Sequence, residues 1–506
     1  MDFREILGVS NRRRLELLES LYYHQKGWSV DQLLINLNCS LPILMNDIKL
    51  INSSDPYFKI VKKKGLYYVV PAQSANLSHL YSGILNFIPE YQILEELLYE
   101  KCNNITELAE KLQLSPTNAR RYIKKIEGVL QRTKMKLCFR PLRIEGNESE
   151  VRNFYYRFYK ERQNTFKNDL PHLKLDQYLA IEKYVKEFIV ENDIWSNYVL
   201  RKRLIYNFYI SLWRIKNDHY YDKQELRKLG LKVPQKETYA LLKRMIKKSS
   251  GLDLTPDFMR DCLWLSFSDS IVFSNTHREY ALIDNPRYQR LFMQHYELIN
   301  KYDEMLGYRL TENEKNDYTT LLCNTVYLYD PDSAAINLLW DNRLFFLREA
   351  MKLYGTGIKK IRMMVETFTK EHNMYQEEGF IRNYTYLLIT VKEKSLKWLV
   401  EQDHPVKALL LSDLTMTEEN FLAYQIRESI YGNINIDHYE KLSGVATQIY
   451  DELERYDCLI TTRAIEGLPK GFPVVVIDHF LTPENVKKIQ DLILYLDEKR
   501  NKALIS

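Results

Sequence analysis

The chain has 506 residues, several times the roughly 100–200 residues of a typical domain, so its length predicts three to five domains. Hydrophobic residues make up 45% and charged residues 27%, and 16 Gly and 15 Pro are too few for a collagenous, low-complexity or largely disordered chain. No apolar run approaches the roughly 18 residues of a membrane span, and the N-terminal segment is charged from its start, so we expect neither a signal peptide nor a membrane partner. The six cysteines lie at least 36 positions apart, which fits neither a disulfide framework nor a metal knuckle. These features predict a cytoplasmic protein that needs no metal and no cofactor.

The charge is distributed unevenly along the chain, although the net value is only +5. Residues 1–165 contain 25 Lys and Arg against 18 Asp and Glu, whereas residues 401–506 contain 11 against 18. A basic N-terminal part is typical of a protein with a polyanionic partner. The acidic C-terminal part would be repelled by the same partner, so we expect the two ends of the chain to have different functions.

Residues 12–70 predict three helices followed by a hairpin. Helical spacing covers 13–25, a capping box at Ser29 begins a short second helix, and 41–51 forms a third. The polar side chains that this plan leaves outside are Asn46 and Lys49 on the third helix and Lys62, Lys63 and Lys64 at the hairpin tip. We interpret this copy as the weaker DNA-binding element, with a structural support or a dimer element as the open alternative.

The same order recurs about 80 residues later. Helices are predicted over 91–101, from Asn104 to Leu112, and over 117–130, the last beginning with Ser115 as N-cap and Pro116 at the first helical position. Its apolar positions, Ala119, Tyr122, Ile123, Ile126 and Leu130, fall on one face. Residues 133–143 then alternate like a ribbon, with Met135, Leu137 and Phe139 on one side.

Cations are concentrated in this second copy. Residues 115–143 contain nine Lys and Arg and one acid, Glu127. The side chains expected to face outward are Thr117, Asn118, Arg120, Arg121, Lys124 and Lys125 on the helix and Lys134, Lys136 and Arg140 on the ribbon. A cationic helix face followed by a basic ribbon is what a major-groove helix with a phosphate-binding wing requires. The alternative is a solvated basic face on a helical hairpin.

From Lys174 to Val400 the pattern is almost entirely helical and predicts two consecutive bundles. The amphipathic segments are 174–191, 197–216, 235–248, 256–273, 286–302, 312–327, 333–354 and 379–400. Motifs of metalloproteases, hydrolases and nucleotide-binding enzymes are absent, so we predict no catalytic residues and no enzyme. His219 lies just past the segment 197–216, at the end of a long helix, where an accessible imidazole is chemically fit to accept a phosphoryl group; a plain helix-terminal cation is the alternative.

The last hundred residues alternate strand and helix. Strands are predicted over 406–411, 434–436, 457–461 and 472–477, and helices over 417–429, 444–454 and 482–497. That order predicts a small parallel sheet with helices on both faces. The loop after its first strand, from Ser412 to Thr417, lacks glycines and carries an acid, which disfavours an anionic ligand there.

The order of these units resembles the Mga/AtxA-like family of virulence transcriptional regulators of low-GC Gram-positive bacteria. The resemblance covers essentially the whole chain and is most specific in Ile105–Val129 and in the segment from Trp213 through His219. It implies a multidomain, mainly α protein with two winged helix-turn-helix domains, two PRD-like helical bundles and a C-terminal α/β EIIB-like domain. The expected bounds are 1–75 and 76–165 for the winged helices, 166–285 and 286–400 for the bundles, and 401–506 for the α/β domain.

The resemblance also implies how the protein is regulated. In this family the phosphotransferase system phosphorylates histidines of the PRD-like domains, which makes His219 a candidate phosphoacceptor; His277 and His372 are further candidates that match no motif. The enzymes that the last domain resembles carry a phosphocysteine after the first strand, and here Ser412 and Asp413 stand in that place. We therefore expect a dimerisation and sensing module rather than a phosphocarrier.

The function predicted from these observations is a DNA-binding transcriptional activator. Its expected partners are double-stranded DNA, a second copy of the chain bound through the EIIB-like domain, and a phosphocarrier protein of the phosphotransferase system. An RNA-binding antiterminator of similar architecture, a phosphocarrier and a purely structural scaffold are the alternatives. The helical start of the chain disfavours the antiterminator, and the missing cysteine disfavours the phosphocarrier.

Overall fold

The computed structural model describes residues 3–24, 26–162, 170–195, 197–223, 226, 230–268, 271–307, 309–329, 339, 341–402, 404–439, 453–465 and 468–503. The chain divides into two compact units. The first consists of Met1–Glu297 and Glu312–Asp341, and the second of Leu298–Thr311 and Asn342–Ser506. None of the described helices combines the length and apolar character that crossing a bilayer requires.

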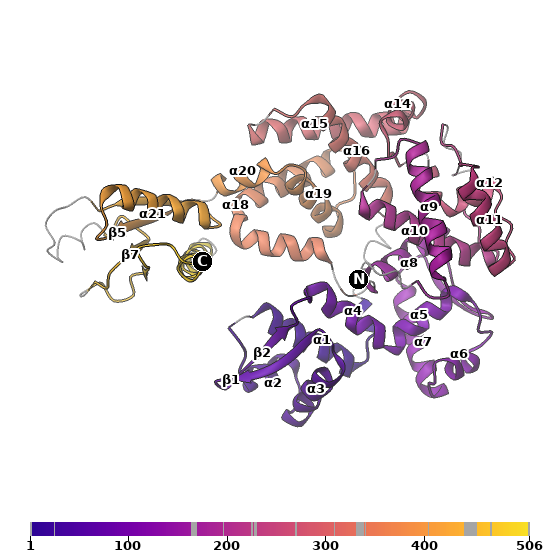
Figure 1. The fold of residues 1–506 in the computed structure, drawn as a ribbon, viewed down its shortest axis with the longest axis horizontal. Coiled ribbons are helices and arrows are strands. Elements are labelled where there is room, and N and C mark those ends of the chain that lie inside the picture. The colour runs from indigo at the N-terminus through magenta and orange to yellow at the C-terminus, as the bar shows by residue number, and fades with distance from the viewer. Residues whose placement is uncertain are drawn as a thin grey trace. The chain divides into compact units, whose positions relative to one another are not determined.

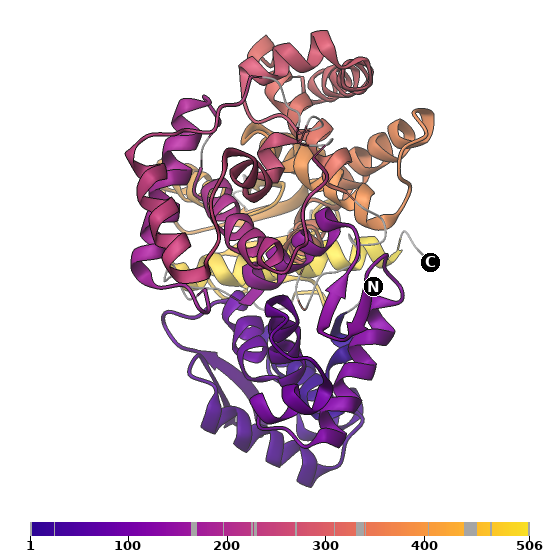
Figure 2. The same cartoon turned by 90° about the vertical axis from the view of Figure 1, so that its right-hand side faces the viewer.

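The first unit begins with three helices and a hairpin, as predicted. The elements are η1 (Phe3–Ile6), α1 (Val9–Tyr23), α2 (Val30–Leu37), α3 (Leu41–Ser54), β1 (Phe58–Lys63) and β2 (Leu66–Pro71). The capping box of α2 is formed, with the Gln32 amide donating to Ser29 Oγ at 3.2 Å and the Ser29 amide donating to Gln32 Oε1 at 2.8 Å. Lys64 and Gly65 both have positive φ, as a two-residue hairpin turn requires. Figures 1 and 2 show these indigo elements gathered into one cluster.

The second helix-turn-helix copy is embedded between two helices that the sequence analysis did not predict. Its elements are α4 (Leu77–Phe87), α5 (Pro89–Tyr99), α6 (Ile105–Lys111), α7 (Pro116–Leu130), β3 (Lys136–Phe139), β4 (Leu142–Glu145) and α8 (Glu148–Arg162). The unpredicted helices, α4 and α8, pack against each other, and α7 packs against α5 and α6. The predicted ribbon is an antiparallel hairpin of β3 and β4, with Leu137 opposite Ile144.

The rest of the first unit is helical, with two departures from prediction. Its elements are α9 (Leu175–Glu191), α10 (Tyr198–Lys216), α11 (Glu237–Ser250), α12 (Pro256–Cys262), α13 (Trp264–Phe267), α14 (Asn275–Asp284), the first part of α15 (Pro286–Leu306) and α16 (Glu312–Leu328). The residues of α15 from Leu298 onward belong to the second unit. The predicted helix 256–273 is wrong, because the chain breaks at Leu263 and again after Phe267. The short helix α14 was not expected. α10 packs against α5, α8, α9 and α12.

The second unit contains the remaining helices, again with shifted ends. α18 (Asn342–Glu371), α19 (Glu378–Thr390) and α20 (Lys394–Gln402) follow one another. Part of the predicted helix 333–354 lies outside the described residues, and α18 continues past its expected end through a kink at Tyr354, where φ is −137° and ψ is 38°. The predicted single helix 379–400 is two helices, α19 and α20.

A four-stranded parallel sheet follows, as predicted. Its elements are β5 (Val406–Leu411), α21 (Met416–Ser429), β6 (Ile434–His438), β7 (Cys458–Thr461), β8 (Val474–Val476) and α23 (Pro483–Ala503). The strand order is β6-β5-β7-β8, and the register places Ala408 beside both Ile436 and Cys458. Cys458 is buried in this core. In the part of the chain that the structure describes, no cysteine forms a disulfide bond. The predicted helix 444–454 lies almost wholly outside the described residues.

Candidate nucleic-acid interface

α7 is built so that one face is buried and the opposite face is exposed. Ser115 caps the helix by accepting a 3.2 Å hydrogen bond from the Asn118 amide, and Pro116 occupies the first helical position, where no amide hydrogen is needed. The buried side chains are Ala119, Ile123, Ile126, Val129 and Leu130. Four of the five predicted apolar positions are therefore confirmed as buried, whereas Tyr122 is half-buried, and packing leaves the cationic face outside.

The predicted polar residues of α7 differ in how freely they reach solvent. Thr117, Arg120, Arg121 and Lys124 are exposed, whereas Asn118 and Lys125 are half-buried. Arg121 lies over the Tyr122 ring, with its guanidinium carbon 5.2 Å from the ring centroid. Lys125 Nζ donates a 3.3 Å hydrogen bond to the carbonyl of Leu7, so one N–H group of this ammonium is already bonded within the protein. Together the exposed side chains form a cationic surface along one side of the helix.

A buried carboxyl group lies close to this helix. Glu90, in the first turn of α5, is fully buried, and the Lys125 ammonium is near enough to act on it electrostatically. Burial raises the pKa of Glu90, because a low-dielectric surrounding disfavours the carboxylate, and Lys125 offsets only part of that effect. No sequence signal distinguished Glu90 from the other acids of the region.

The hairpin after α7 is less cationic than the sequence suggested. Lys134 and Lys136 are exposed, but Lys136 Nζ lies 3.3 Å from Glu145 Oε2, and Arg143 is also paired with Glu145. Hydrogen bonds from Cys138, Arg143 and Lys136 lower the pKa of Glu145 to about 2, so this acid is ionised at neutral pH. Of the three apolar residues expected on one side of the ribbon, Met135 and Leu137 are buried, whereas Phe139 is 41% exposed near the hairpin tip.

The first copy presents a different surface at matching positions. Counted from the N-cap residues Ser40 and Ser115, four cations of α7, Arg120, Arg121, Lys124 and Lys125, correspond to Met45, Asn46, Lys49 and Leu50 of α3. All four α3 residues are exposed, and so is Leu41 at the start of the helix. Lys62, Lys63 and Lys64 are exposed at the hairpin tip, with Lys62 Nζ 5.3 Å from the centroid of the Tyr67 ring. The outward positions of Asn46 and Lys49 are therefore confirmed, on a surface that is largely apolar.

The three candidate histidines lie in different surroundings. The expected free access of His219 is wrong, because its side chain is 21% exposed and its Nε2 lies 2.8 Å from Glu100 Oε1. His277 is 4% exposed, with Nδ1 2.8 Å from Ser274 Oγ, which caps α14. His372 follows α18, half-buried, with its ring 4.8 Å from that of Phe368. Burial thus makes His277 the least accessible of the three.

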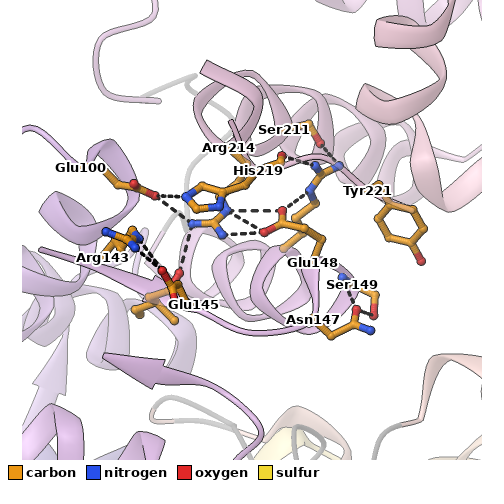
Figure 3. Close-up of polar contacts among 12 residues, drawn as sticks. Glu100, Arg143, Glu145, Asn147, Glu148, Ser149, Ser211, Arg214, His219 and Tyr221 are labelled. Atoms are coloured by element: carbon orange, nitrogen blue, oxygen red, sulfur yellow. Dashed lines mark hydrogen bonds and ion pairs between the residues drawn. The ribbon is translucent and has the colours of Figure 1, made fainter. Parts of the chain in front are cut away.

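The partner of His219 belongs to a set of charged residues that sequence reasoning missed. Figure 3 shows Glu100, His219 and Arg214 pointing toward one another, with Glu148 facing Arg214 from the start of α8. We call the set Glu100, Glu148, Arg152, Arg214, His219 and Asp261 the buried arginine network. Among the described residues, no group of three or more His, Cys, Asp or Glu side chains is placed to hold a metal ion.

Comparison with known proteins identifies the segment that contains α7. Residues 73–159 match the Mga helix-turn-helix domain, a range that includes α4 to α7, the hairpin and most of α8. The chain is 18% identical to a protein of Streptococcus pneumoniae serotype 4 whose name describes a trans-acting regulator, over 90% of this chain and 92% of that protein.

Two regulators of Bacillus anthracis match over shorter ranges. The capsule synthesis positive regulator AcpA is 26% identical over 41% of this chain and 43% of its own length. The anthrax toxin expression trans-acting positive regulator is 28% identical over 30% of this chain and 33% of its own length. These homologues are named as regulators and not as enzymes. The chain therefore carries an Mga helix-turn-helix domain and is a distant homologue of the Mga/AtxA-type positive regulators.

Proposed function

We propose that this protein is a positive regulator of transcription that binds duplex DNA through α7. The observation that carries the proposal is the exposed cationic face of α7, opposite a fully packed apolar face, inside an Mga helix-turn-helix domain. An exposed helix of this kind fits the major groove, and cations along it contact phosphates or guanine edges. The names of the homologues support the positive sign of regulation.

Each side chain of the surface has a proposed role. Thr117 and Asn118 lie in the first turn of α7, which enters the groove most deeply in helix-turn-helix complexes. Arg120, Arg121 and Lys124 supply base or phosphate contacts, and Lys134 and Lys136 supply phosphate contacts from the hairpin. In the first copy, Asn46, Lys49 and the tip residues Lys62, Lys63 and Lys64 add weaker backbone contacts.

Regulation by the phosphotransferase system forms the second part of the proposal. We assign residues 166–285 and 286–400 to PRD-like bundles whose histidines receive phosphoryl groups from a phosphocarrier protein. His219 is the preferred acceptor, because its ring keeps partial exposure while His277 is nearly fully buried. His372 is the candidate in the second bundle.

Self-association through the EIIB-like residues 401–506 is the third part. Phe421 and Tyr424 lie three positions apart on α21, so they share one face of the helix, and each is 58% exposed. Large exposed aromatic side chains that lie together are typical of protein interfaces. The net negative charge of this segment disfavours DNA as its partner.

The DNA-binding proposal is tested by removing the cations of α7 together. The variant with Arg120, Arg121, Lys124 and Lys125 all changed to Ala is compared with a control in which Arg201, Arg244, Lys247 and Lys248 are changed to Ala. The control also removes two arginines and two lysines, but it removes them from exposed positions on α10 and α11. Affinity for a promoter fragment and for hairpin RNA is measured between about 50 and 200 mM salt.

The proposal predicts that the α7 variant loses duplex affinity and that its salt slope falls by about 3, since each lost phosphate contact removes roughly 0.9 from the slope. The control keeps the slope of the wild type. Equal slopes in the two variants would refute the assignment of α7, and tighter binding to RNA would favour the antiterminator alternative.

A further inference from the structure

The buried arginine network connects the helical segment after residue 166 with the helix-turn-helix domain. Arg152 of α8 and Arg214 of α10 are 0% and 1% exposed, which is rare for arginine and requires that their charges be paired. Arg214 joins the helical segment to the helix-turn-helix domain, since it lies on α10 and binds three groups of the domain that contains α7. These groups are Glu100 Oε1 at 3.1 Å, the carbonyl of Ile144 at 3.1 Å and Glu148 Oε1 at 2.5 Å.

Arg152 extends the network from the helix-turn-helix domain into the helices beyond. Its Nε donates to Glu148 at 2.9 Å, and its Nη1 donates to Asp261 of α12 at 2.5 Å and to Ser211 of α10 at 3.0 Å. Its Nη2 donates to the carbonyl of His219 at 3.2 Å. The two arginines therefore cross-link α8, α10 and α12, and they fix the backbone of the loop that carries His219.

The network ends at the carboxyl end of α5. Glu100 follows α5 in a left-handed conformation with φ of 51°, and the loop that it begins leads into α6. Three side chains from the end of α10 converge here. Arg214 and His219 bind the Glu100 carboxylate, and Asn217 Nδ2 donates to the carbonyl of Tyr99 at 3.4 Å. A displacement at the end of α10 is thus transmitted to the chain that enters the helix-turn-helix.

The same loop is tied to the hairpin. The Leu142 amide at the start of β4 donates a 2.9 Å hydrogen bond to the carbonyl of Cys102, two residues after Glu100. The carbonyl of Ile144, two residues further along β4, is bound by Arg214. The loop before α6 and the hairpin after α7 flank the helix pair α6–α7 in sequence. They therefore contact each other, and both contact Arg214.

The network contains one more carboxylate than it has guanidinium groups. Three carboxylates, from Glu100, Glu148 and Asp261, face two guanidinium groups. The carboxylate of Glu100 takes its remaining contact from the imidazole of His219. A donor N–H at Nε2 satisfies this carboxylate, whereas a negative charge in its place would face a carboxylate that is 4% exposed, where water screens little of the repulsion.

We infer that Glu100 is a positioning residue, through which the charge state of the His219 side chain sets the placement of α7 and its hairpin. A neutral hydrogen-bond donor at position 219 keeps the contact with the Glu100 carboxylate, and an anion at this position breaks it. This inference rests on the proposed function, because its output is the affinity for DNA. It assigns to Glu100 a role that contact with DNA does not explain, since the carboxylate is buried and negatively charged.

The test compares His219→Glu with Tyr220→Glu. Both add one negative charge at neighbouring positions of the same loop, but Tyr220 is exposed and its contact is to Asp218 rather than to Glu100. General repulsion of DNA therefore affects both variants alike, and the difference between them reports the contact with Glu100. Thermal unfolding of each variant establishes that it is folded.

Two measurements are made on the full chain. The first is affinity for a promoter fragment, which we expect to fall at least tenfold for His219→Glu relative to Tyr220→Glu. Adding Glu100→Gln to His219→Glu should recover most of that loss. The side-chain amide of Gln is neutral, so it does not repel the new carboxylate, and its N–H groups can donate a hydrogen bond to it. The second is hydrogen exchange of the Leu142 amide, which should quicken in His219→Glu and return toward the wild-type rate in the double variant.

Hydrogen exchange keeps the inference separate from the proposed function. If the wild-type chain does not bind duplex DNA, the proposed function fails, while faster exchange at Leu142 in His219→Glu alone still supports the coupling. If DNA binding is present but His219→Glu and Tyr220→Glu match in affinity and in exchange, Glu100 is not a positioning residue. Failure of Glu100→Gln to rescue His219→Glu would also overturn the inference.

Discussion

Lys125 donates a hydrogen bond to the carbonyl of Leu7 across 3.3 Å, which ties α7 to the segment that precedes α1. Lys124, its neighbour in sequence, is exposed on the surface proposed to face DNA. Two adjacent lysines of one helix therefore have different surroundings. This difference gives the first prediction.

Lys124→Ala should lower the salt slope of DNA binding by about 1, because one phosphate contact is lost. Lys125→Ala should change the slope by less than half as much. The measurement is the dependence of affinity on salt concentration for each variant alone. If the two slopes fall equally, Lys125 contacts DNA in spite of its bond to Leu7.

Glu145 should weaken DNA binding, because it neutralises the cations of the hairpin. Glu145→Gln leaves Lys136 without its ionic partner at 3.3 Å and should strengthen affinity several-fold at low salt, with a steeper salt slope. Glu110→Gln on α6 is the control, since it removes one exposed negative charge outside the hairpin. Equal gains in both variants would mean that net charge alone, and not the pairing of Lys136, controls affinity.

Local sequence patterns were sufficient to predict the elements that make the proposed interface. The cap at Ser115, the proline after it and the apolar spacing from Ala119 to Leu130 are all encoded within one helix, and the structure forms α7 as expected. The parallel sheet was predictable for the same reason, since β5, β7 and β8 are short runs of mainly apolar residues and β6 alternates isoleucine with polar residues. α8 was missed although Val151, Phe154, Tyr155, Phe158 and Tyr159 have clear helical spacing.

The buried arginine network could not be predicted, because its contacts join residues far apart in sequence. His219 and Glu100 are separated by 119 positions, and Arg214 and Glu148 by 66. An arginine in an amphipathic helix ordinarily faces water, and nothing in the neighbourhood of Arg214 indicates that it is buried. For the same reason the expected exposure of His219, inferred from its place at a helix end, was wrong.

Removal of Arg214 should be strongly destabilising. Arg214→Met keeps most of the side-chain volume but leaves the buried Glu100 and Glu148 carboxylates without this partner, and loss of one partner of a buried pair typically costs about 3–5 kcal/mol. Arg201→Met, at an exposed position of the same helix, should change the free energy of unfolding by less than about 0.5 kcal/mol. Denaturant unfolding of both variants measures the difference. A cost below about 1 kcal/mol for Arg214→Met would mean that water enters and solvates the freed carboxylates.

Glu90 should make the stability of the protein fall as the pH rises above the range where free carboxyl groups titrate. Burial raises the pKa of Glu90 above its ordinary value of 4.5, so the folded state holds a proton that the unfolded chain releases first. The stabilising contribution of the protonated group is complete below the unfolded pKa and is lost as the pH rises through the folded pKa. Glu90→Gln carries a permanent neutral amide and should not show this loss.

The free energy of unfolding of Glu90→Gln, relative to that of the wild type, should therefore increase between about pH 4 and pH 8 and level off once Glu90 is ionised in the folded state. Glu127→Gln on α7 is the matched control, because it removes one carboxylate from a position that is only half-buried. The increase should be larger for Glu90→Gln than for this control. Parallel pH profiles for Glu90→Gln and the wild type would show that the Lys125 ammonium compensates the burial of the carboxylate fully, and that the proton is not retained on folding.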